Sequence, residues 1–526
     1  MIFRLREIPL RLGEEEYQLA EKVALLLNIP VTDIVDWKIV RKGIDARRKP
    51  DVLRVYTVDF TVIDPVPLLP MQKENPCLIV VEKTATEDLG LLAKNLQVVV
   101  VGMGPAGLFA ALRLAESGVS VTLVERGKPV AARLQDVRNF RQKKIFDAES
   151  NIQFGEGGAG AFSDGKLTSR LNHPLTRQVL ERLVAFGAPE EILRQAKPHI
   201  GSDRLRVVLI NFRRQLLSLG VDIRYSTRLT GLEVSRGQIC GCRLNDQEFV
   251  ESEQLVLAVG HSARDTYSML YDAGVKIESK PFAVGVRVEH PLELINSIQY
   301  GMKSHPQLPA AEYRLAWNNQ QSGRGVYSFC MCPGGMVVNA ASEVGGIVVN
   351  GMSNFRRDGN YSNSALVVSV RPEDFDGDDP LAGVRFQRHW EQAAFLAGGG
   401  DWSVPAQPLL EFLQGQGGQL CSTCLPRVAH ADLADCLPGF VVAELRQALP
   451  IFNRRMRGFV GSEAILTGVE TRTSAPLRIL RNAQHESVSH PGLYPAGEGA
   501  GYAGGIMSAA IDGLKVAESL LRKYQT

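Results

Sequence analysis

The chain has 526 residues, of which 45% are apolar and 22% charged, and its formal net charge is +2. That length exceeds what one hydrophobic core supports, so two or three domains are expected. The small net charge excludes a general attraction to nucleic acid or anionic lipid. Glycine is abundant, and the 50 glycines fall in clusters, which suggests that backbone lies close to a ligand.

Residues 96–115 are nearly all apolar and could be mistaken for a membrane span. They contain glycines and a proline in a nucleotide-binding pattern, with Arg113 near the end, so we interpret them as a buried strand and helix. The first residues lack the apolar core of a signal peptide. The dispersed cysteines are typical of a reducing compartment. We therefore expect a cytoplasmic protein without a membrane partner, and the sequence does not indicate an oligomeric state.

Residues 1–70 have the pattern of a small α+β domain. Strand-like alternation at residues 2–5 and 53–58 flanks helical periodicity at residues 14–27. A proline-rich stretch ends this domain, and we assign residues 71–95 to a linker.

The remainder predicts an interrupted α/β fold. Residues 96–279 alternate between strands and helices, which indicates a mostly parallel, Rossmann-like sheet. Short strands separated by Gly and Asn over residues 280–455 predict an inserted antiparallel α+β substrate domain. Residues 456–526 return to a strand, a glycine loop and a helix, and so complete the first domain.

The first motif follows a strand at residues 97–101. In Gly102-Met103-Gly104-Pro105-Ala106-Gly107, the first glycine makes a tight turn, the second admits a pyrophosphate, and the third allows close helix packing. The following helix N-terminus offers N–H groups to that pyrophosphate, and Glu125, after a second strand, can bind ribose. A glycine-rich packing turn is the alternative. We assign to cofactor binding Gly102, Gly104, Pro105, Ala106, Gly107, Glu125, Arg126 and Arg133.

A second glycine cluster, residues 155–160, matches the same spacing without a buried strand before it or a helix after it. It is therefore not a second Rossmann fingerprint. The cluster, including Gly157, Gly158 and Ala159, suggests backbone lying against a flat ligand, and a surface loop is the alternative.

The C-terminal segment distinguishes FAD from NAD. Residues 492–505 form a strand and a glycine loop with Glu498, and they lead into a helix from Ile506. A simple NAD domain does not need this late unit, whereas an extended FAD does. The strand that ends before Gly260 fits the strand-then-glycine element that completes the AMP-binding half of the nucleotide domain in two-domain flavoproteins. We assign to FAD, in this part of the chain, Gly260, Gly497, Glu498, Gly504, Gly505 and Ile506.

At this point the chain resembles the FAD-dependent dehydrogenase family, a largely uncharacterised group within the glutathione-reductase-like FAD superfamily. The resemblance rests on the motifs at residues 43–47, 154–167, 329–335, 350–353, 468–474 and 497–505. It implies an FAD-binding fold and a non-covalent FAD, and it does not imply a particular substrate.

The flavin would supply the redox chemistry of an oxidoreductase that transfers a hydride to or from a small substrate. We assign substrate-side roles to Glu470, Arg472 and Arg478, because arginine suits a carboxylate or phosphate. A structural Arg–Glu pair is the alternative. No second complete Rossmann unit is present, so NAD(P)H would act only as a transient electron donor.

Other chemistries are less well supported. The C-x-C pairs at residues 240–242 and 330–332 and the C-x-x-C at residues 421–424 lack the partners of a zinc site, so no metal is expected. Buried inert cysteines are favoured over redox-active ones. Basic residues at 38–49 leave open a flavin-dependent RNA modifier or RNA-binding flavoprotein, although nucleic acid is not the favoured partner.

Overall fold

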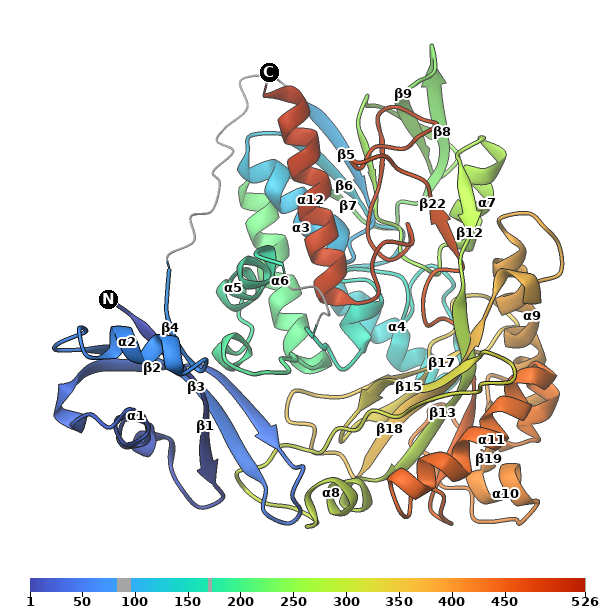
Figure 1. The fold of residues 1–526 in the computed structure, drawn as a ribbon. Coiled ribbons are helices and arrows are strands. Elements are labelled where there is room, and N and C mark those ends of the chain that lie inside the picture. Colours follow the sequence, from blue (N-terminus) through green and yellow to red (C-terminus); the bar gives the residue numbers. More distant parts are fainter. Residues whose placement is uncertain (83–95, 169–172, 526) are drawn as a thin grey trace.

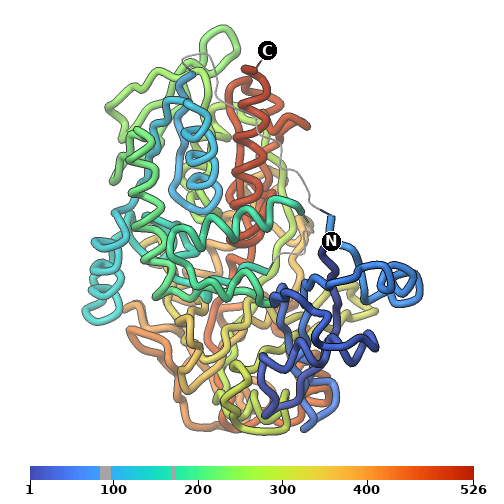
Figure 2. Tube along the Cα trace, turned by 90° about the vertical axis from the view of Figure 1, so that its left-hand side faces the viewer, coloured from blue at the N-terminus to red at the C-terminus, as the bar shows by residue number. Residues whose placement is uncertain are grey.

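A computed structural model describes residues 1–82, 96–168 and 173–525. It contains three domains, and Figure 1 shows the N-terminal domain as a lobe beside two larger parts. Figure 2 shows the same lobe from the side. The predicted α/β class, with a Rossmann-like domain and a largely antiparallel insert, is confirmed.

The N-terminal domain is a four-stranded sheet of order β2-β3-β1-β4 whose core includes residues of two helices. Its strand β4 extends the domain to residue 80, so the predicted boundary at residue 70 lies too early, and residues 83–95 of the predicted linker lie outside the described residues. The elements are β1 (Phe3–Arg11), α1 (Leu19–Leu27), β2 (Ile34–Asp45), β3 (Leu53–Val62), α2 (Leu68–Glu74) and β4 (Leu78–Val80).

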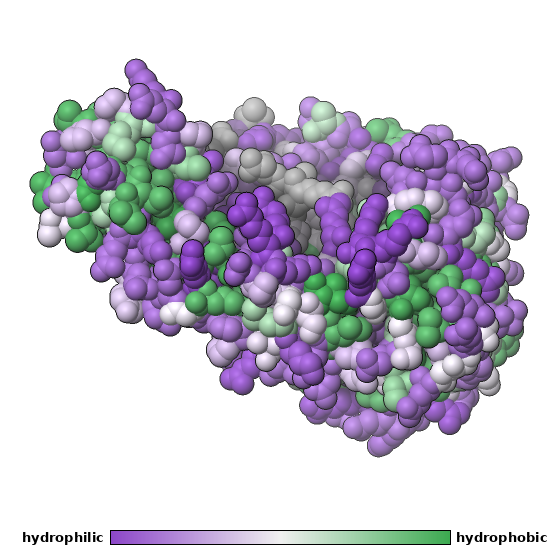
Figure 3. Space-filling view, turned by 60° about the horizontal axis from the view of Figure 1, so that its bottom comes forward, coloured by the Kyte–Doolittle hydropathy of each residue, from purple (hydrophilic) through white to green (hydrophobic). Residues whose placement is uncertain are grey.

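This domain is docked against the other two. Lys42 in β2 donates its backbone N–H to the carbonyl of Arg194 (2.6 Å), and its own carbonyl accepts from Ala196 (2.8 Å). Lys49 donates its ammonium to the carbonyl of Ile298. Large hydrophobic residues are also exposed on this domain, the left-hand lobe of Figure 3; they include Tyr17, Leu25, Leu26, Val31, Val35 and Ile63.

The second domain is built on a parallel five-stranded sheet of order β23-β11-β5-β6-β7. The C-terminal strand β23 pairs with β11, so the end of the chain completes a sheet begun almost 400 residues earlier. Its elements are β5 (Gln97–Val101), α3 (Pro105–Glu116), β6 (Ser120–Val124), α4 (Val130–Lys143), α5 (Leu175–Ala185), α6 (Ser202–Ser218), β7 (Asp222–Arg224), β11 (Leu255–Leu257), α7 (Arg264–Asp272), β23 (Leu493–Pro495) and α12 (Ile506–Tyr524).

The alternation of side chains in β5 divides the core. Val98 and Val100 face the helices α3, α5, α6 and α12, while Val99 and Val101 face α7 and a small antiparallel sheet. Strands with both faces buried read as continuous apolar runs, which explains the span-like segment at residues 96–115. No helix of the described residues has the length and apolar content needed to cross a membrane. The small sheet comprises β8 (Leu229–Ser235), β9 (Gln238–Leu244) and β10 (Glu248–Glu251).

Helices α3 and α12 lie side by side on one face of the sheet (Figure 1). Their close approach depends on Gly513, because a Cβ there would lie 2.1 Å from the carbonyl oxygen of Ala106. The contact places the beginnings of both helices next to each other, with Gly104 before one and Gly505 before the other.

The inserted domain is a seven-stranded sheet of order β14-β15-β18-β13-β21-β19-β20. Strand β21 belongs to this sheet, so the insert extends to about residue 470 and not to the predicted 455. Its elements are β13 (Phe282–Pro291), α8 (Leu292–Tyr300), β14 (Ala316–Asn318), β15 (Gly325–Cys332), β18 (Tyr361–Val370), α9 (Ala382–Ala397), β19 (Val404–Pro408), α10 (Leu409–Gln414), β20 (Val428–His430), α11 (Gly439–Arg455) and β21 (Ile465–Glu470).

Two short antiparallel pairs complete the structure. One is β12 (Ile277–Ser279) with β22 (Leu477–Ile479), where the chain leaves and re-enters the nucleotide domain. The other is β16 (Met336–Asn339) with β17 (Val349–Met352). Both crossings between the domains therefore run beside each other.

Replacing Gly513 with alanine should lower the free energy of unfolding by about 1–3 kcal/mol, because α12 must move away from α3. Gly439→Ala, at the start of α11, is the matched control, since a Cβ there meets nothing within 4 Å. It should leave stability unchanged or raise it by up to about 1 kcal/mol. Denaturant unfolding measures both, and equal effects would contradict the close-packing account.

Candidate dinucleotide and substrate site

One elongated pocket runs along the carboxyl ends of the parallel strands and continues to the inserted domain. Ligands bind at this edge in open α/β sheets. Most of the residues assigned to the cofactor from the sequence line it: Gly102, Gly104, Pro105, Ala106, Glu125, Arg126, Gly158, Ala159, Gly260, Glu498, Gly504, Gly505 and Ile506.

The carboxylate of Glu125 holds three backbone segments together. One oxygen accepts from the backbone N–H of Met103 (2.9 Å), and the other accepts from Gly127 and Gly155 (both 2.9 Å). The side chain is buried. Since a carboxylate has about four lone-pair sites, these three bonds leave capacity for one further donor, such as the expected ribose hydroxyl.

The glycine loops leave a space that a ligand would fill. Gly104 has an ordinary negative φ of −73°, and a Cβ there would meet nothing within 4 Å. A Cβ on Gly504, just before α12, also meets nothing within 4 Å. Neither packing nor backbone conformation therefore requires glycine at Gly104. A phosphate lying against the backbone does, so the cradle fits the pyrophosphate of a dinucleotide.

The second glycine loop is joined to the first. The backbone N–H of Gly157 donates to the carbonyl of Met103 (2.9 Å), and a Cβ on Gly158 would lie 3.1 Å from the Cα of Gly104. The loop is therefore a wall of the pocket and not a surface loop, which settles the alternative left open above. Gly157 itself lies behind the lining.

Arg126 lies at the end of the pocket nearest β6 and β7. Its guanidinium stacks 4.1 Å from the ring centre of Phe154 and pairs with Glu149 (2.8 Å) and Asp265 (2.9 Å). These contacts hold the planar, charged guanidinium of Arg126 in place at this end of the pocket.

Four residues assigned to the cofactor do not line the pocket. Gly107 packs against the carbonyl of Gly102, and Gly497 donates its N–H to Asp512 (2.7 Å). Arg133 is fully buried and donates to the carbonyls of residues 151, 152, 155 and 156. With Gly157, these residues shape the cradle, and Arg133 is a structural clamp on the second loop and not a direct ligand.

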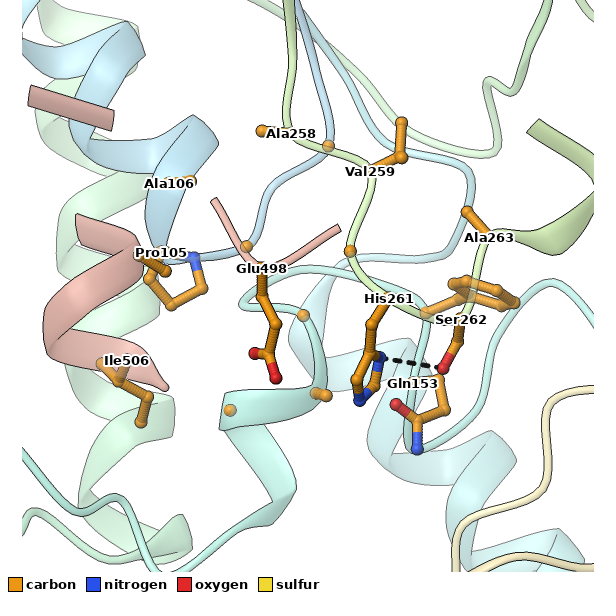
Figure 4. Close-up of a pocket in the computed structure, with 18 of the residues that line it drawn as sticks. Pro105, Ala106, Gln153, Ala258, Val259, His261, Ser262, Ala263, Glu498 and Ile506 are labelled. Carbon is orange, nitrogen blue, oxygen red and sulfur yellow. Dashed lines mark hydrogen bonds between the residues drawn. The ribbon is translucent and has the colours of Figure 1, made fainter. Parts of the chain in front are cut away.

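Glu498 and His261 both line the pocket, and Figure 4 shows Glu498 between Pro105 on one side and His261 on the other. Burial raises the pKa of Glu498 to about 7, with Cys330 adding to the rise and Lys280 opposing it. Burial, with Arg472 and Arg264, lowers the pKa of His261 to about 3. His261 is therefore neutral near pH 7, and its Nδ1 contacts the hydroxyl of Ser262 (3.1 Å).

Arg472 lines the pocket, but its donors are occupied. Its Nε and Nη2 donate to the two carboxylate oxygens of Glu391 (2.9 and 2.6 Å), and its Nη1 donates to Ser262 and Ser342. Burial acts to raise the pKa of Glu391, yet Arg264 and Arg472 outweigh it and hold the pKa well below its usual range. The structural Arg–Glu pair, left open above, is the arrangement found.

Glu470 and Arg478 also differ from the predicted substrate roles. Glu470 lines the pocket and is paired with the fully buried Arg287 (3.0 Å). Arg478 lies outside the pocket lining and pairs with Glu278 (3.3 Å) between β22 and β12. The structure thus brings Glu470 and Arg472 to the pocket as paired groups and leaves Arg478 at the surface.

Sequence reasoning missed Lys166 as a pocket residue. The cations of the lining are Arg126, Lys166, Arg228 and Arg472. Among the described residues, Lys166 is the one of these four that forms no direct ion pair with a carboxylate, although Glu312 and Asp164 lie near enough to interact with its charge. Lys166 belongs to the motif at residues 154–167 and comes shortly after the second glycine cluster. Its position after that cluster could have indicated a place in the pocket. Phe329, Cys330 and Asn350 contribute to the lining from the inserted domain. The described residues contain no cluster of three or more metal-ligating side chains.

Comparisons with known proteins agree with this geometry. A family model for pyridine nucleotide-disulphide oxidoreductases matches residues 96–266, and one for FAD-dependent proteins, C-terminal domain-like, matches residues 281–473. A domain of unknown function matches residues 3–61. An uncharacterised protein of Clostridium beijerinckii is 43% identical over 530 residues, which cover 100% of this chain and 99% of the relative.

Similar solved structures include the flavin-dependent brominase Bmp2, 12% identical over 82% of this chain and 80% of that chain, with a TM-score of 0.39. A glycine oxidase from Bacillus cereus is 12% identical over 82% of this chain and 96% of that chain, with a TM-score of 0.35.

The fold and the site define an α/β dinucleotide-binding protein whose nucleotide domain is interrupted by an insert and completed by the C-terminal segment. With the family matches, the chain belongs to the family of FAD-dependent proteins that its motifs resemble. Its cofactor is FAD, as the C-terminal glycine loop predicted.

Gly104→Ala should leave the stability of the FAD-free protein unchanged, because the added Cβ meets no protein atom within 4 Å. It should weaken FAD binding by at least about tenfold, a loss of about 1.4 kcal/mol, because the methyl group occupies the phosphate position. Gly417→Ala, also free of contacts, is the control and should bind FAD normally. Equal FAD affinity of the two variants would contradict the assigned cradle.

Glu498→Gln should change how the stability of the FAD-free protein depends on pH. The folded-state pKa of about 7 lies above the ordinary 4.5, so the stability due to neutral Glu498 is complete below pH 4.5 and is lost as the pH rises towards 7. Relative to the variant, the wild type should therefore lose stability between about pH 5 and pH 8. Exposed Glu463→Gln is the control. A constant difference between wild type and Glu498→Gln across this range would contradict a raised pKa.

Proposed function

We propose that the protein is an FAD-dependent oxidoreductase that transfers a hydride between a small anionic substrate and non-covalently bound FAD. The observation that carries the proposal is one pocket that joins the dinucleotide cradle to a second end beneath the inserted domain, where Lys166 forms no direct ion pair with a carboxylate of the described residues. When bound, FAD supplies reversible two-electron chemistry.

The residues that would hold FAD come from the two halves of the nucleotide domain. Gly104 and the start of α3 would receive the pyrophosphate, and the remaining lone pairs of Glu125 would bind ribose. Glu498 lies between these groups and the inserted domain, and its carboxyl group has no hydrogen-bond partner among the described residues, so a cofactor hydroxyl is a fitting donor.

Helix α12 supports the redox role. It begins at Ile506 without a side chain capping its first N–H groups, and Gly505 precedes it. The positive end of a helix favours negative charge nearby, and a two-electron reduced flavin carries such a charge. The neutral form of His261 adds no competing positive charge in the pocket.

Lys166 would bind the anionic group of the substrate. Arg472 and Arg287 are neutralised by Glu391 and Glu470, so they contribute less field to the pocket than their number suggests. Within the described part of the chain, the ammonium of Lys166 forms no direct ion pair, so it is the better anchor for a carboxylate. NAD(P)H would act as a transient donor that reaches the same pocket.

Anaerobic mixing of the holoenzyme with NADH, NADPH or small carboxylates, followed by flavin absorbance, tests the function. Two-electron reduction without an accumulating semiquinone is expected, and deuterium at the transferred position should slow it. Accumulation of the semiquinone, with no isotope effect, would contradict hydride transfer.

Lys166→Met should weaken the binding of small carboxylates by about 10- to 100-fold, corresponding to about 1.5–3 kcal/mol for a hydrogen bond to a charged group. Lys166→Arg keeps the charge and should retain most of the affinity. Perturbation of the flavin spectrum measures binding, and released FAD serves as the control for cofactor loss. Wild-type affinity of Lys166→Met would show that the anion is bound elsewhere.

A further inference from the structure

Strand β15 carries a one-residue bulge at its end. Phe329 is opposite Ala365 and Cys332 is opposite Asn363, so β15 has one residue more than β18 between these pairs. Cys330 lies in the bulge with a left-handed φ of +44°, a conformation that few non-glycine residues adopt. Bulges re-aim side chains, and here Cys330 lines the FAD pocket while Cys332 is fully buried.

The bulge brings two thiols together. The Cys332 thiol donates to the carbonyl oxygen of Cys330, with 3.4 Å between sulfur and oxygen. That carbonyl also accepts from Nη1 of Arg287 (3.2 Å). A Cβ on Gly351 would lie 2.9 Å from the sulfur of Cys332, so β17 closes the pair from behind.

The charges around the pair favour one thiolate. The neighbouring Cys332 thiol lowers the pKa of Cys330, and Lys166 and Arg287 lower it further, against burial and Glu470. Proximity to Cys330, together with burial, raises the pKa of Cys332. Cys330, which faces the pocket, is therefore the more acidic thiol of the pair. The thiolate is the reactive form of cysteine.

We propose that Cys330 and Cys332 form a redox-active dithiol that reduces small disulfides entering the FAD pocket. The Cys330 thiolate attacks one sulfur of the disulfide R–S–S–R, which forms a mixed disulfide and releases R–S⁻. The Cys332 sulfur then displaces the second R–S⁻, whose negative charge accepts the proton of Cys332. One S–S bond is broken and one is formed, and the two electrons pass from the dithiol to the substrate.

This activity goes beyond the proposed function and does not need hydride transfer. It replaces the sequence-based preference for inert cysteines at this one pair. The cation that we assign to the anionic substrate, Lys166, would also stabilise the attacking thiolate before a substrate enters.

The chain contains an internal control with the same spacing. Cys240 and Cys242 also form a C-x-C pair, in β9, and neither lines the FAD pocket. Burial, with Glu248 adding, raises the pKa of Cys242 to about 11. No residue from 240 to 242 has a positive φ. A generic reactivity of C-x-C pairs would therefore affect both pairs, whereas the proposal concerns only Cys330 and Cys332.

The test uses the reduced holoenzyme, freed of reductant and mixed anaerobically with bis(2-hydroxyethyl) disulfide. Acid quenching, alkylation and peptide mass spectrometry then locate the disulfides. We expect a Cys330–Cys332 disulfide that forms at least about tenfold faster than any reaction at Cys240 or Cys242, because a more acidic thiol has a larger thiolate fraction, although the thiolate itself is a weaker nucleophile. The rate should reach its plateau below the ordinary thiol pKa of about 8.5.

Three variants give further readouts besides turnover. Cys332→Ser should accumulate the mixed disulfide at Cys330, Cys330→Ser should abolish the reaction, and Lys166→Met should move the pH profile upward. Retained FAD absorbance shows that each variant is folded. If the wild-type pair reacts no faster than Cys240 and Cys242, the proposal is wrong, whatever the variants do. Flavin reduction by NAD(P)H is measured separately, so failure of one proposal does not imply failure of the other.

Discussion

The dinucleotide cradle depends on one buried carboxylate. Glu125 accepts from the backbone of the turn after β5, from the segment after β6 and from the second glycine loop. Without it, several buried N–H groups would lose their acceptor, at a cost of about 1–3 kcal/mol each. Glu125 therefore has a structural role before any ribose binds. The pocket is pre-formed because Arg133 clamps the same loop from its other side.

A second constraint lies where the insert joins the nucleotide domain. Glu391 of α9 binds both Arg264 of α7 and Arg472 on the return path, and all three side chains are almost completely buried. Removing one partner of such a cluster costs about 3–5 kcal/mol, because a charge is then left buried without compensation. The cluster fixes the insert over the pocket and neutralises the arginines there.

Local patterns predicted the parts of the site that depend on short sequence distances. The turn at Gly102, the helix after Gly104 and the strand before Glu125 follow from residues within about 25 positions. The role of Arg472 could not be predicted from such short distances, because its partner Glu391 is 81 positions away in the sequence. The orientation of Cys330 depends on a single extra residue relative to β18, which only strand pairing reveals. The boundary near residue 455 was wrong because β21 pairs with β13, almost 180 residues earlier.

A crystal structure of the protein with FAD tests the central claim most directly. The account predicts the pyrophosphate against Gly104 and the start of α3, the adenosine ribose at Glu125, and the flavin ring near Glu498 and Gly505 at the end lined by Lys166 and Cys330. An FAD bound with its pyrophosphate away from Gly104, or with its flavin ring at the Arg126 end, would contradict it.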